Sequence, residues 1–164
     1  MLGRLYESQN CSAARALELV GERWSLLILR NAAFAGQTRF SEFERRLGIA
    51  PNILASRLEG FVAAGLMEMR PNPGHRGQSE YLLTEKGRDF VPAIVALTTW
   101  GDRWAAPDGP PMVYEHEACG GEVEVELRCR SCHDVTTPAA VRARPGPGFV
   151  DIDIQPRSGP SPAT

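Results

Sequence analysis

The chain has 164 residues, of which 43% are hydrophobic and 23% charged, and its formal net charge is −2. These values are typical of a soluble globular domain with a small appendage. No apolar run reaches the roughly 20 residues that span a bilayer, and residues 1–10 lack the apolar core of a signal peptide. We therefore expect a cytoplasmic protein with no membrane partner.

The N-terminal part of the chain predicts three helices. Residues 11–21 carry apolar side chains at helical spacing and end at a glycine. Residues 22–34 are apolar nearly all round, which predicts a buried central helix. Ser41 then begins a short helix with Glu44 completing a capping box, and Gly48 ends that helix.

A fourth helix, a β-hairpin and a long helix follow. Pro51 starts the fourth helix, in which apolar residues recur on one face. Residues 66–70 and 80–84 read as two strands, and a turn-rich tip separates them. The long helix is expected over residues 85–104, where Pro92 predicts a kink or a late start.

This order of elements predicts a fold that is mainly α with a small β component, a winged helix-turn-helix. In this fold the second helix of the pair presents its N-terminal residues to the major groove of DNA. Asn52 can read adenine, Ser56 can reach a base or a phosphate, and Arg57 can read guanine or hold a phosphate. At the tip of the hairpin, His75 and Arg76 are placed to reach the minor groove or the DNA backbone.

Other interpretations of this surface remain open. Its polar side chains could be merely solvated, in which case the helix-turn-helix is a protein-interaction module that no longer binds DNA. Arg57 precedes Leu58 on the apolar face and could form a structural ion pair. A metal or thiol enzyme is a further alternative, but no Ser-His-Asp order, glycine-rich phosphate loop or HExxH motif occurs, so we expect no enzyme.

Five motifs occur in order along residues 11–104. They are a lone cysteine before the first helix, "GERW" between the first two helices, "LASRL" on the fourth, "YLLTEKG" closing the wing and "WG" late in the last helix. On these motifs the segment resembles the HxlR family of winged-helix transcription regulators, relatives of the MarR regulators. The resemblance implies an obligate homodimer, formed by the N-terminal segment and the last helix, on a palindromic operator in double-stranded DNA.

The resemblance also suggests how such a regulator would work. We expect a repressor that leaves its operator when it binds a small aromatic or quinone-like effector, or when it is oxidised. Arg39 and Ser41 are expected to contact the DNA backbone or the minor groove beside the base-reading residues.

Cys11 stands where the resemblance implies a redox or electrophile sensor. The helix N-terminus and Arg15 would favour its thiolate, whereas the alternative is a buried thiol that only packs. A non-covalent ligand is the other option, in a pocket at the dimer interface lined by aromatic side chains that could equally be core. These aromatic residues are Trp24, Phe90, Trp100 and Trp104.

The sequence beyond the long helix predicts a second, smaller unit. The winged helix would occupy residues 1–106, a small β-rich extension residues 107–155, and a disordered tail residues 156–164. The extension is acidic, which argues against its holding DNA.

The extension contains a cluster of metal-ligand residue types. His116, Cys119, Cys129 and Cys132 follow the spacing H-x2-C-x9-C-x2-C, which is zinc-ribbon-like with one Cys replaced by His. Four such ligands would hold a structural Zn²⁺ and stabilise a piece too small for a core of its own. His133 is a competing fourth ligand with poorer geometry. The alternatives are a site that no longer binds metal, three free thiols, or a disulfide between Cys129 and Cys132.

Overall fold

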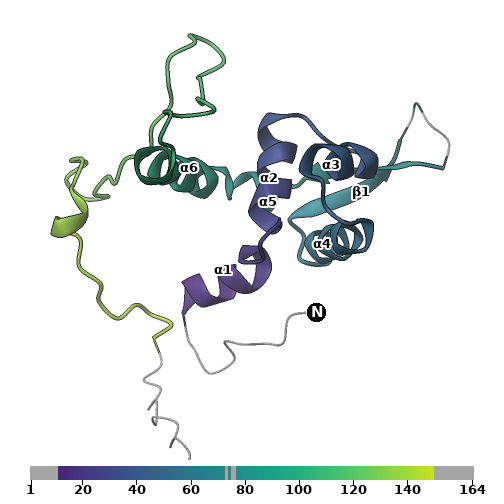
Figure 1. Ribbon diagram of the computed structural model, residues 1–164. Coiled ribbons are helices and arrows are strands. Elements are labelled where there is room, and N and C mark those ends of the chain that lie inside the picture. Colours follow the sequence, from purple (N-terminus) through teal and green to yellow (C-terminus); the bar gives the residue numbers. More distant parts are fainter. Residues whose placement is uncertain (1–10, 73, 75–76, 150–164) are drawn as a thin grey trace, which may run out of the picture.

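The computed structural model describes residues 11–72, 74 and 77–149. Its elements are α1 Ser12–Val20, α2 Ser25–Phe34, α3 Phe40–Leu47, α4 Pro51–Ala63, β1 Met67–Pro71, β2 Ser79–Leu83, α5 Glu85–Arg88, α6 Val91–Ala105 and the 3-10 turn η1 Pro138–Ala140. Figure 1 shows α3 and α4 beside the hairpin, and α6 on the opposite side of α2. The predicted winged helix-turn-helix, mainly α with a small sheet, is confirmed. No helix in the described ranges is long and apolar enough to cross a membrane.

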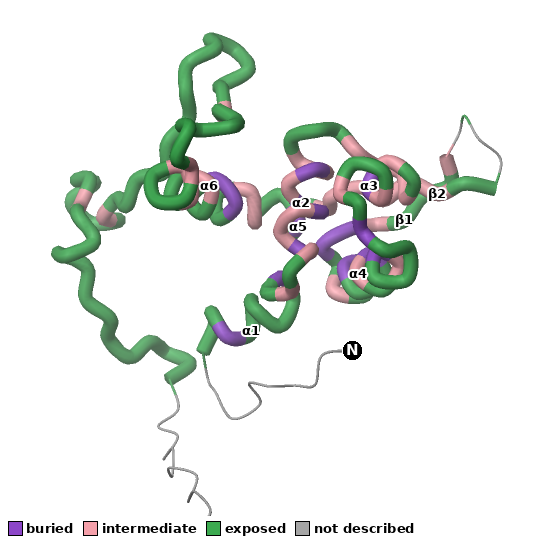
Figure 2. The backbone as a smooth tube through the Cα atoms, viewed as in Figure 1, coloured by how far each residue is buried: buried purple, intermediate pink, exposed green. Residues whose placement is uncertain are grey.

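The hydrophobic core lies where α2, α3, α4 and β1 meet. Ile28, Phe43, Leu54 and Leu58 are fully buried there, and Phe61 is 2% exposed. Figure 2 shows the buried positions concentrated in these elements and nearly absent from the C-terminal segment. The three buried residues of α4 are spaced i, i+4, i+7, which confirms the apolar face expected for this helix. Its other face is left to solvent.

The start of α3 differs from the sequence analysis, which predicts a capping box at Ser41 and Glu44. That prediction is wrong, because Arg39 is the N-cap residue and has an extended backbone, with φ −100° and ψ 145°. The Glu42 carboxylate accepts hydrogen bonds from the backbone N–H groups of Arg39 at 3.0 Å and Thr38 at 3.1 Å. Glu42 thus satisfies donors that a cap at Ser41 would leave unpaired, and the helix begins earlier.

The two strands form the predicted antiparallel hairpin, in which Met67 pairs with Leu83 at the base. The backbone N–H of Tyr81 also donates to the carbonyl of Thr38 at 2.7 Å. The segment before α3 is thereby attached to the hairpin, which fixes the wing relative to the helix-turn-helix.

A group of hydrogen bonds attaches α5 to the C-terminal end of α4. The Thr84 hydroxyl donates to the carbonyl of Gly65 at 2.6 Å. The Lys86 ammonium donates to the carbonyl of Ala64 at 2.7 Å. Carbonyl groups at a helix end need such partners, so these side chains complete α4 as well as beginning α5.

The helix expected over residues 85–104 is two helices in the structure. Pro92 lies in the first turn of α6, the position that tolerates proline, and the predicted late start is confirmed. Gly87 of α5 is buried, and a Cβ atom there would overlap the carbonyl oxygen of Leu66. Only glycine allows this close approach.

The described part of the C-terminal extension has little β structure. It contains two isolated antiparallel bridges, Glu115–Glu122 and Arg128–Val135, and the strand expected from "EVEVEL" does not form. Val125, in the middle of that stretch, is 45% exposed. A single strand without a partner or a surface to cover has nothing to stabilise it. The second expected strand, "FVDIDI", lies outside the described residues apart from Phe149.

Candidate nucleic-acid interface

The first turn of α4 is exposed and has no side-chain cap. Ala50 precedes it in an extended conformation, with φ −61° and ψ 136°, and Pro51 occupies the first turn. Asn52 and Ser56 are exposed, whereas Leu54 between them is fully buried. The helix therefore buries one face and presents small polar side chains, with its positive dipole end, on the other. A groove-reading helix requires this arrangement.

Arg57 lies on α4 but is directed away from the exposed turn. It forms an ion pair with Glu22, which precedes α2, and each of the two side chains is 21% exposed. Its Nε atom is buried and has no hydrogen-bond partner within the described ranges. The structural ion pair that the sequence left open is thus present, and in this conformation Arg57 is not extended towards a base.

Arg39 and Ser41 lie at the start of α3. The Arg39 guanidinium hydrogen-bonds to Glu42, with Nε 2.8 Å from Oε1. This hydrogen bond, helped by the backbone N–H of Arg39, lowers the pKa of Glu42 to about 2 and raises the pKa of Arg39. The Arg39 side chain is still 40% exposed, and Ser41 is exposed. Both residues are accessible to a phosphate group.

The wing contributes one described cation that sequence reasoning did not select. Arg70 at the end of β1 is exposed and forms an ion pair with Glu68 on the same strand. His75 and Arg76, the predicted wing contacts, lie outside the described residues. Two further exposed cations, Arg45 and Arg46, occupy the last turn of α3, just before the turn into α4.

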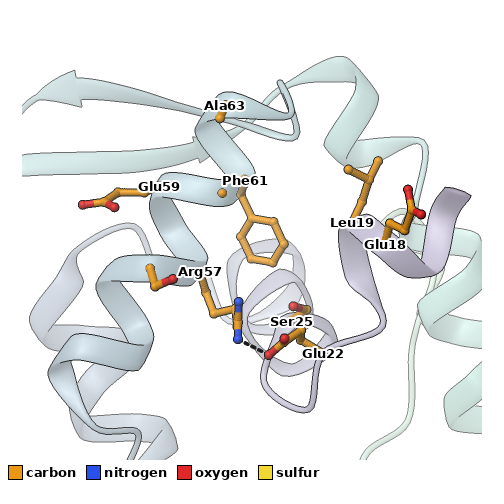
Figure 3. A pocket seen from close by; sticks show the side chains of 10 residues that line it. Glu18, Leu19, Glu22, Ser25, Arg57, Glu59, Phe61 and Ala63 are labelled. Carbon is orange, nitrogen blue, oxygen red and sulfur yellow. Dashed lines mark hydrogen bonds and ion pairs between the residues drawn. The ribbon is translucent and has the colours of Figure 1, made fainter. Parts of the chain in front are cut away.

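A cavity of about 420 Å³ lies between α4 and α1 (Figure 3). Figure 3 shows Arg57 reaching from α4 to Glu22, while Leu19 and Glu18 line the opposite wall. Glu18, Glu22 and Glu59 are the acidic residues of the lining, although Glu22 is paired with Arg57 and Figure 3 shows the Glu59 side chain directed away from Arg57. The Arg57 guanidinium belongs to this lining, and its Nε is buried and has no hydrogen-bond partner among the described residues.

Sequence reasoning missed this cavity, although a signal for it exists. Ser56, Gly60 and Ala63 are small residues spaced i, i+4, i+7, so they share one side of α4 and line the cavity. A Cβ atom at Gly60 would meet nothing within 4 Å. The second signal is the charge pattern, since an arginine beside the apolar face needs an acidic partner from another element.

The residues expected to sense a ligand are not gathered in one protomer. Trp24 and Phe90 are half-buried and pack against the core, whereas Trp100 and Trp104 are 61% and 66% exposed on α6. The guanidinium of Arg23 also covers the Trp24 ring, 5.3 Å from its centroid. The aromatic pocket therefore has no counterpart within a single copy of the described chain.

Cys11 is exposed at the N-cap position of α1, where it makes no side-chain capping hydrogen bond. It lines an open cavity together with Ser12, Arg15 and residues 143–149 of the extension. The structure thus places the thiol at the surface and not among core side chains.

The Cys/His residues of the extension form two separate pairs. His116 Nδ1 lies 3.2 Å from Cys119 Sγ. The backbone N–H groups of Cys132 and Ser131 lower the pKa of the Cys129 thiol. Within the described residues, no three His, Cys, Asp or Glu side chains come together as a metal site. Zinc binding therefore stays a prediction at this point.

The family model of HxlR-like helix-turn-helix proteins matches residues 19–109. An uncharacterised HTH-type transcriptional regulator of Mycobacterium tuberculosis strain H37Rv is 47% identical over 139 residues, 84% of this chain and 87% of that protein. This alignment is longer than the family match, so the relative also shares sequence outside residues 19–109.

Solved structures give the same result. PA1607, a proposed transcription factor, superposes with a TM-score of 0.76 at 35% identity, covering 85% of this chain and 97% of that one. The redox regulator HypR in its reduced form superposes with a TM-score of 0.51 at 26% identity, covering 57% of this chain and 92% of that one. The chain belongs to the family of HxlR-like helix-turn-helix proteins.

Proposed function

We propose that the protein is a homodimeric transcriptional regulator that binds double-stranded DNA through the first turn of α4 and represses its target. The observation that carries this proposal is the exposed, uncapped start of α4, with Asn52 and Ser56 beside the buried Leu54. Asparagine hydrogen-bonds adenine bidentately in the major groove, and the N–H groups of a helix start bind phosphate. The description of the mycobacterial relative as an HTH-type regulator supports the same conclusion.

The test is a fluorescence-anisotropy titration with the DNA upstream of the protein's own gene. Asn52→Ala should weaken specific binding by about 1–3 kcal/mol per half-site, roughly 5- to 150-fold, and should relax base preference at one position. Thr137→Ala is the control, because Thr137 is an exposed, uncharged polar residue of the extension. Binding by wild type that is equal for operator and scrambled DNA would contradict the proposal.

The dimer is supported by apolar side chains left exposed on α6 and α1. Leu97, Trp100 and Trp104 are 50%, 61% and 66% exposed, and Leu17 of α1 is 50% exposed. Soluble monomers rarely leave such large side chains together in water. A second copy that covers them would place two recognition helices roughly 34 Å apart, in successive major grooves. Sedimentation equilibrium of the full chain should give twice the protomer mass.

The cavity between α1 and α4 is the effector site that we favour over the aromatic residues. The acidic residues of the lining disfavour an anionic ligand, and a ligand that displaces the atoms covering the Nε of Arg57 would meet a donor without a partner among the described residues, which suits a neutral carbonyl. A quinone or a related planar ketone has that acceptor on an apolar ring. A hydrogen bond from Arg57 to the ligand would disturb the Glu22–Arg57 ion pair, which links α4 to the segment before α2.

Gly60 allows the cavity to be closed without harming the fold. Gly60→Met should fill the space and abolish release of DNA by a neutral quinone such as duroquinone, while leaving DNA binding in place. Gly60→Ala, which adds one methyl group where nothing lies within 4 Å, is the matched control and should still respond. Normal induction of the Gly60→Met variant would exclude the cavity as the effector site.

Oxidation sensed by Cys11 is the second candidate signal. It is favoured by the exposure of the thiol at a helix start and by the likeness to HypR, which is described as a redox regulator. Cys11→Ser should keep DNA binding and lose the response to hydrogen peroxide or hypochlorite. A Cys11→Ser variant that still responds would leave the cavity as the only proposed route.

A further inference from the structure

The C-terminal extension contains two turns with the same hydrogen-bond pattern, thirteen residues apart. In the first, the N–H of His116 donates to the carbonyl of Gly121 at 2.8 Å, and the N–H of Gly120 donates to the carbonyl of His116 at 2.8 Å. In the second, the N–H of Cys129 donates to Asp134 at 2.9 Å, and the N–H of His133 donates to Cys129 at 3.0 Å. Each of these donors and acceptors thus has a counterpart thirteen positions later, although a further bond of the first turn, from the N–H of Cys119 to the carbonyl of His116 at 3.1 Å, has none in the described second turn.

The agreement extends beyond the two turns. The flanking bridges, Glu115–Glu122 and Arg128–Val135, are also thirteen residues apart. So are two outer hydrogen bonds, from the N–H of Val123 to Tyr114 and from the N–H of Thr136 to Leu127, both 2.8 Å long. Residues 114–123 and 127–136 are therefore two copies of one supersecondary unit, although few of their residues are identical.

The matching hydrogen bonds and bridges identify which positions of the two turns are equivalent. Cys119 matches Cys132, and His116 matches Cys129, so each turn presents two metal-ligand residues spaced i, i+3. Gly120 matches His133, and both have a left-handed backbone, with φ 70° and 62°. His133 thus holds the position that shapes the turn, and His116 holds a ligand position. This decides between the two histidines that the sequence left in competition.

The distance inside the first pair suits a metal. His116 Nδ1 and Cys119 Sγ are 3.2 Å apart, and the N···S edge of a tetrahedral zinc site is about 3.6 Å for bonds of ~2.05 and ~2.3 Å. The second pair, Cys129 and Cys132, has the same i, i+3 spacing, and both residues line one cavity of the extension.

We propose that the extension binds one Zn²⁺ per protomer through His116, Cys119, Cys129 and Cys132. Each turn supplies two ligands, and the metal draws the two half-sites to a common centre. The three residues from Glu124 to Glu126 connect the two units, and at ~3.3–3.6 Å per residue they span about 10 Å. On binding, the three thiols pass their protons to the buffer and His116 coordinates as the neutral imidazole.

The proposed zinc site would stabilise the extension in place of a hydrophobic core. Val123, Val125, Leu127 and Val135 are between 43% and 53% exposed, so the segment has no hydrophobic core of its own in the protomer. A closed site with four protein ligands leaves no position for substrate, so its role is structural. The proposal is independent of DNA binding, because it rests on the extension alone.

The test is metal analysis of the full chain, purified with a phosphine reductant and dialysed without chelator. Wild type should contain one zinc per protomer, and cobalt exchanged into it should show the intense visible bands of a tetrahedral thiolate site. His116→Ala and Cys129→Ser should weaken zinc affinity about 100-fold or more. His133→Asn and Cys11→Ser should retain full zinc and the cobalt spectrum, because neither residue is a proposed ligand.

Three outcomes would overturn the proposal. One is a wild-type protein that neither contains zinc nor takes it up at micromolar concentration. Another is half a zinc per protomer, which would mean a different ligand set. The third is loss of zinc in His133→Asn with retention in His116→Ala, which would reverse the equivalence of the two turns.

Discussion

Arg57 has two possible roles that one set of variants can distinguish. It either contacts a DNA base or holds the recognition helix in place through its ion pair with Glu22. Arg57→Met keeps the aliphatic length of the side chain and removes its charge, leaving Glu22 without its partner. Breaking a fully buried pair costs about 3–5 kcal/mol and losing an exposed one about 0–1 kcal/mol. Because both side chains are 21% exposed, we expect a loss of about 1–2 kcal/mol in the free energy of unfolding.

Thermal denaturation measures this loss directly. For a domain of about 60–100 residues, such as the winged helix, a loss of 1 kcal/mol lowers Tm by about 4–8 °C. The Arg57→Met variant should therefore melt roughly 4–16 °C below wild type. Glu22→Gln should lose stability by a similar amount, and the double variant should lose less than the sum, since the two residues form one interaction. In anisotropy titrations, the ratio of affinities for operator and for single-base variants of the operator should stay unchanged.

The opposite pattern would refute this reasoning. If Arg57→Met melts like wild type but no longer distinguishes the operator from its variants, Arg57 contacts a base when DNA is bound. The ion pair would then be a resting position of the free protein.

Three further predictions concern the fold, its pH dependence and the dimer. Gly87→Ala should lose at least ~2 kcal/mol of unfolding free energy, because the new Cβ overlaps the Leu66 carbonyl, whereas Gly60→Ala should be neutral or slightly stabilising in the same urea titration. The contribution of ionised Glu42 to the free energy of unfolding is complete above pH about 4.5 and is lost as the pH falls towards its folded pKa of about 2. Glu42→Gln should therefore flatten the decline of Tm between about pH 5 and pH 3. An unchanged slope would assign that decline to other groups. Trp104→Lys should shift the sedimentation equilibrium towards monomer by about 100-fold or more, because it puts a charge where a second copy would bury an indole, and a fully dimeric variant would place the interface elsewhere.

The helix-turn-helix could be predicted from the sequence because its signals are local. Gly48 ends α3 with a φ of 61°, Pro51 starts α4, and the buried spacing of Leu54 and Leu58 follows from the helical period. Each of these signals depends on a few neighbouring residues. The capping residue of α3 could not be predicted in the same way, because Ser41 is a good cap by type and the choice depends on the strand-like backbone before Arg39.

The interactions between elements were harder to foresee. That Arg57 pairs with Glu22 depends on two residues 35 positions apart, and the sequence could offer the ion pair only as an alternative. The "EVEVEL" alternation predicted a strand on period alone, whereas a strand also needs a partner. The equivalence of the two turns in the extension could not be read from residue identity, since His116 and Cys129 differ and only the backbone reveals that they correspond.

The attachment of α5 to α4 bears on how a signal could reach DNA. Since Thr84 and Lys86 donate hydrogen bonds to the carbonyl groups of Gly65 and Ala64, directly after α4, the C-terminal end of the recognition helix is attached to the segment that leads into α6. In the proposed dimer, a small change in the angle between the two copies would therefore also move both recognition helices. Successive major grooves on one side of a duplex are roughly 34 Å apart. If the distance between the two recognition helices changes by a few ångströms, the helices no longer fit both grooves at once. A change in the distance between the recognition helices of the two protomers would then end repression, without either protomer unfolding.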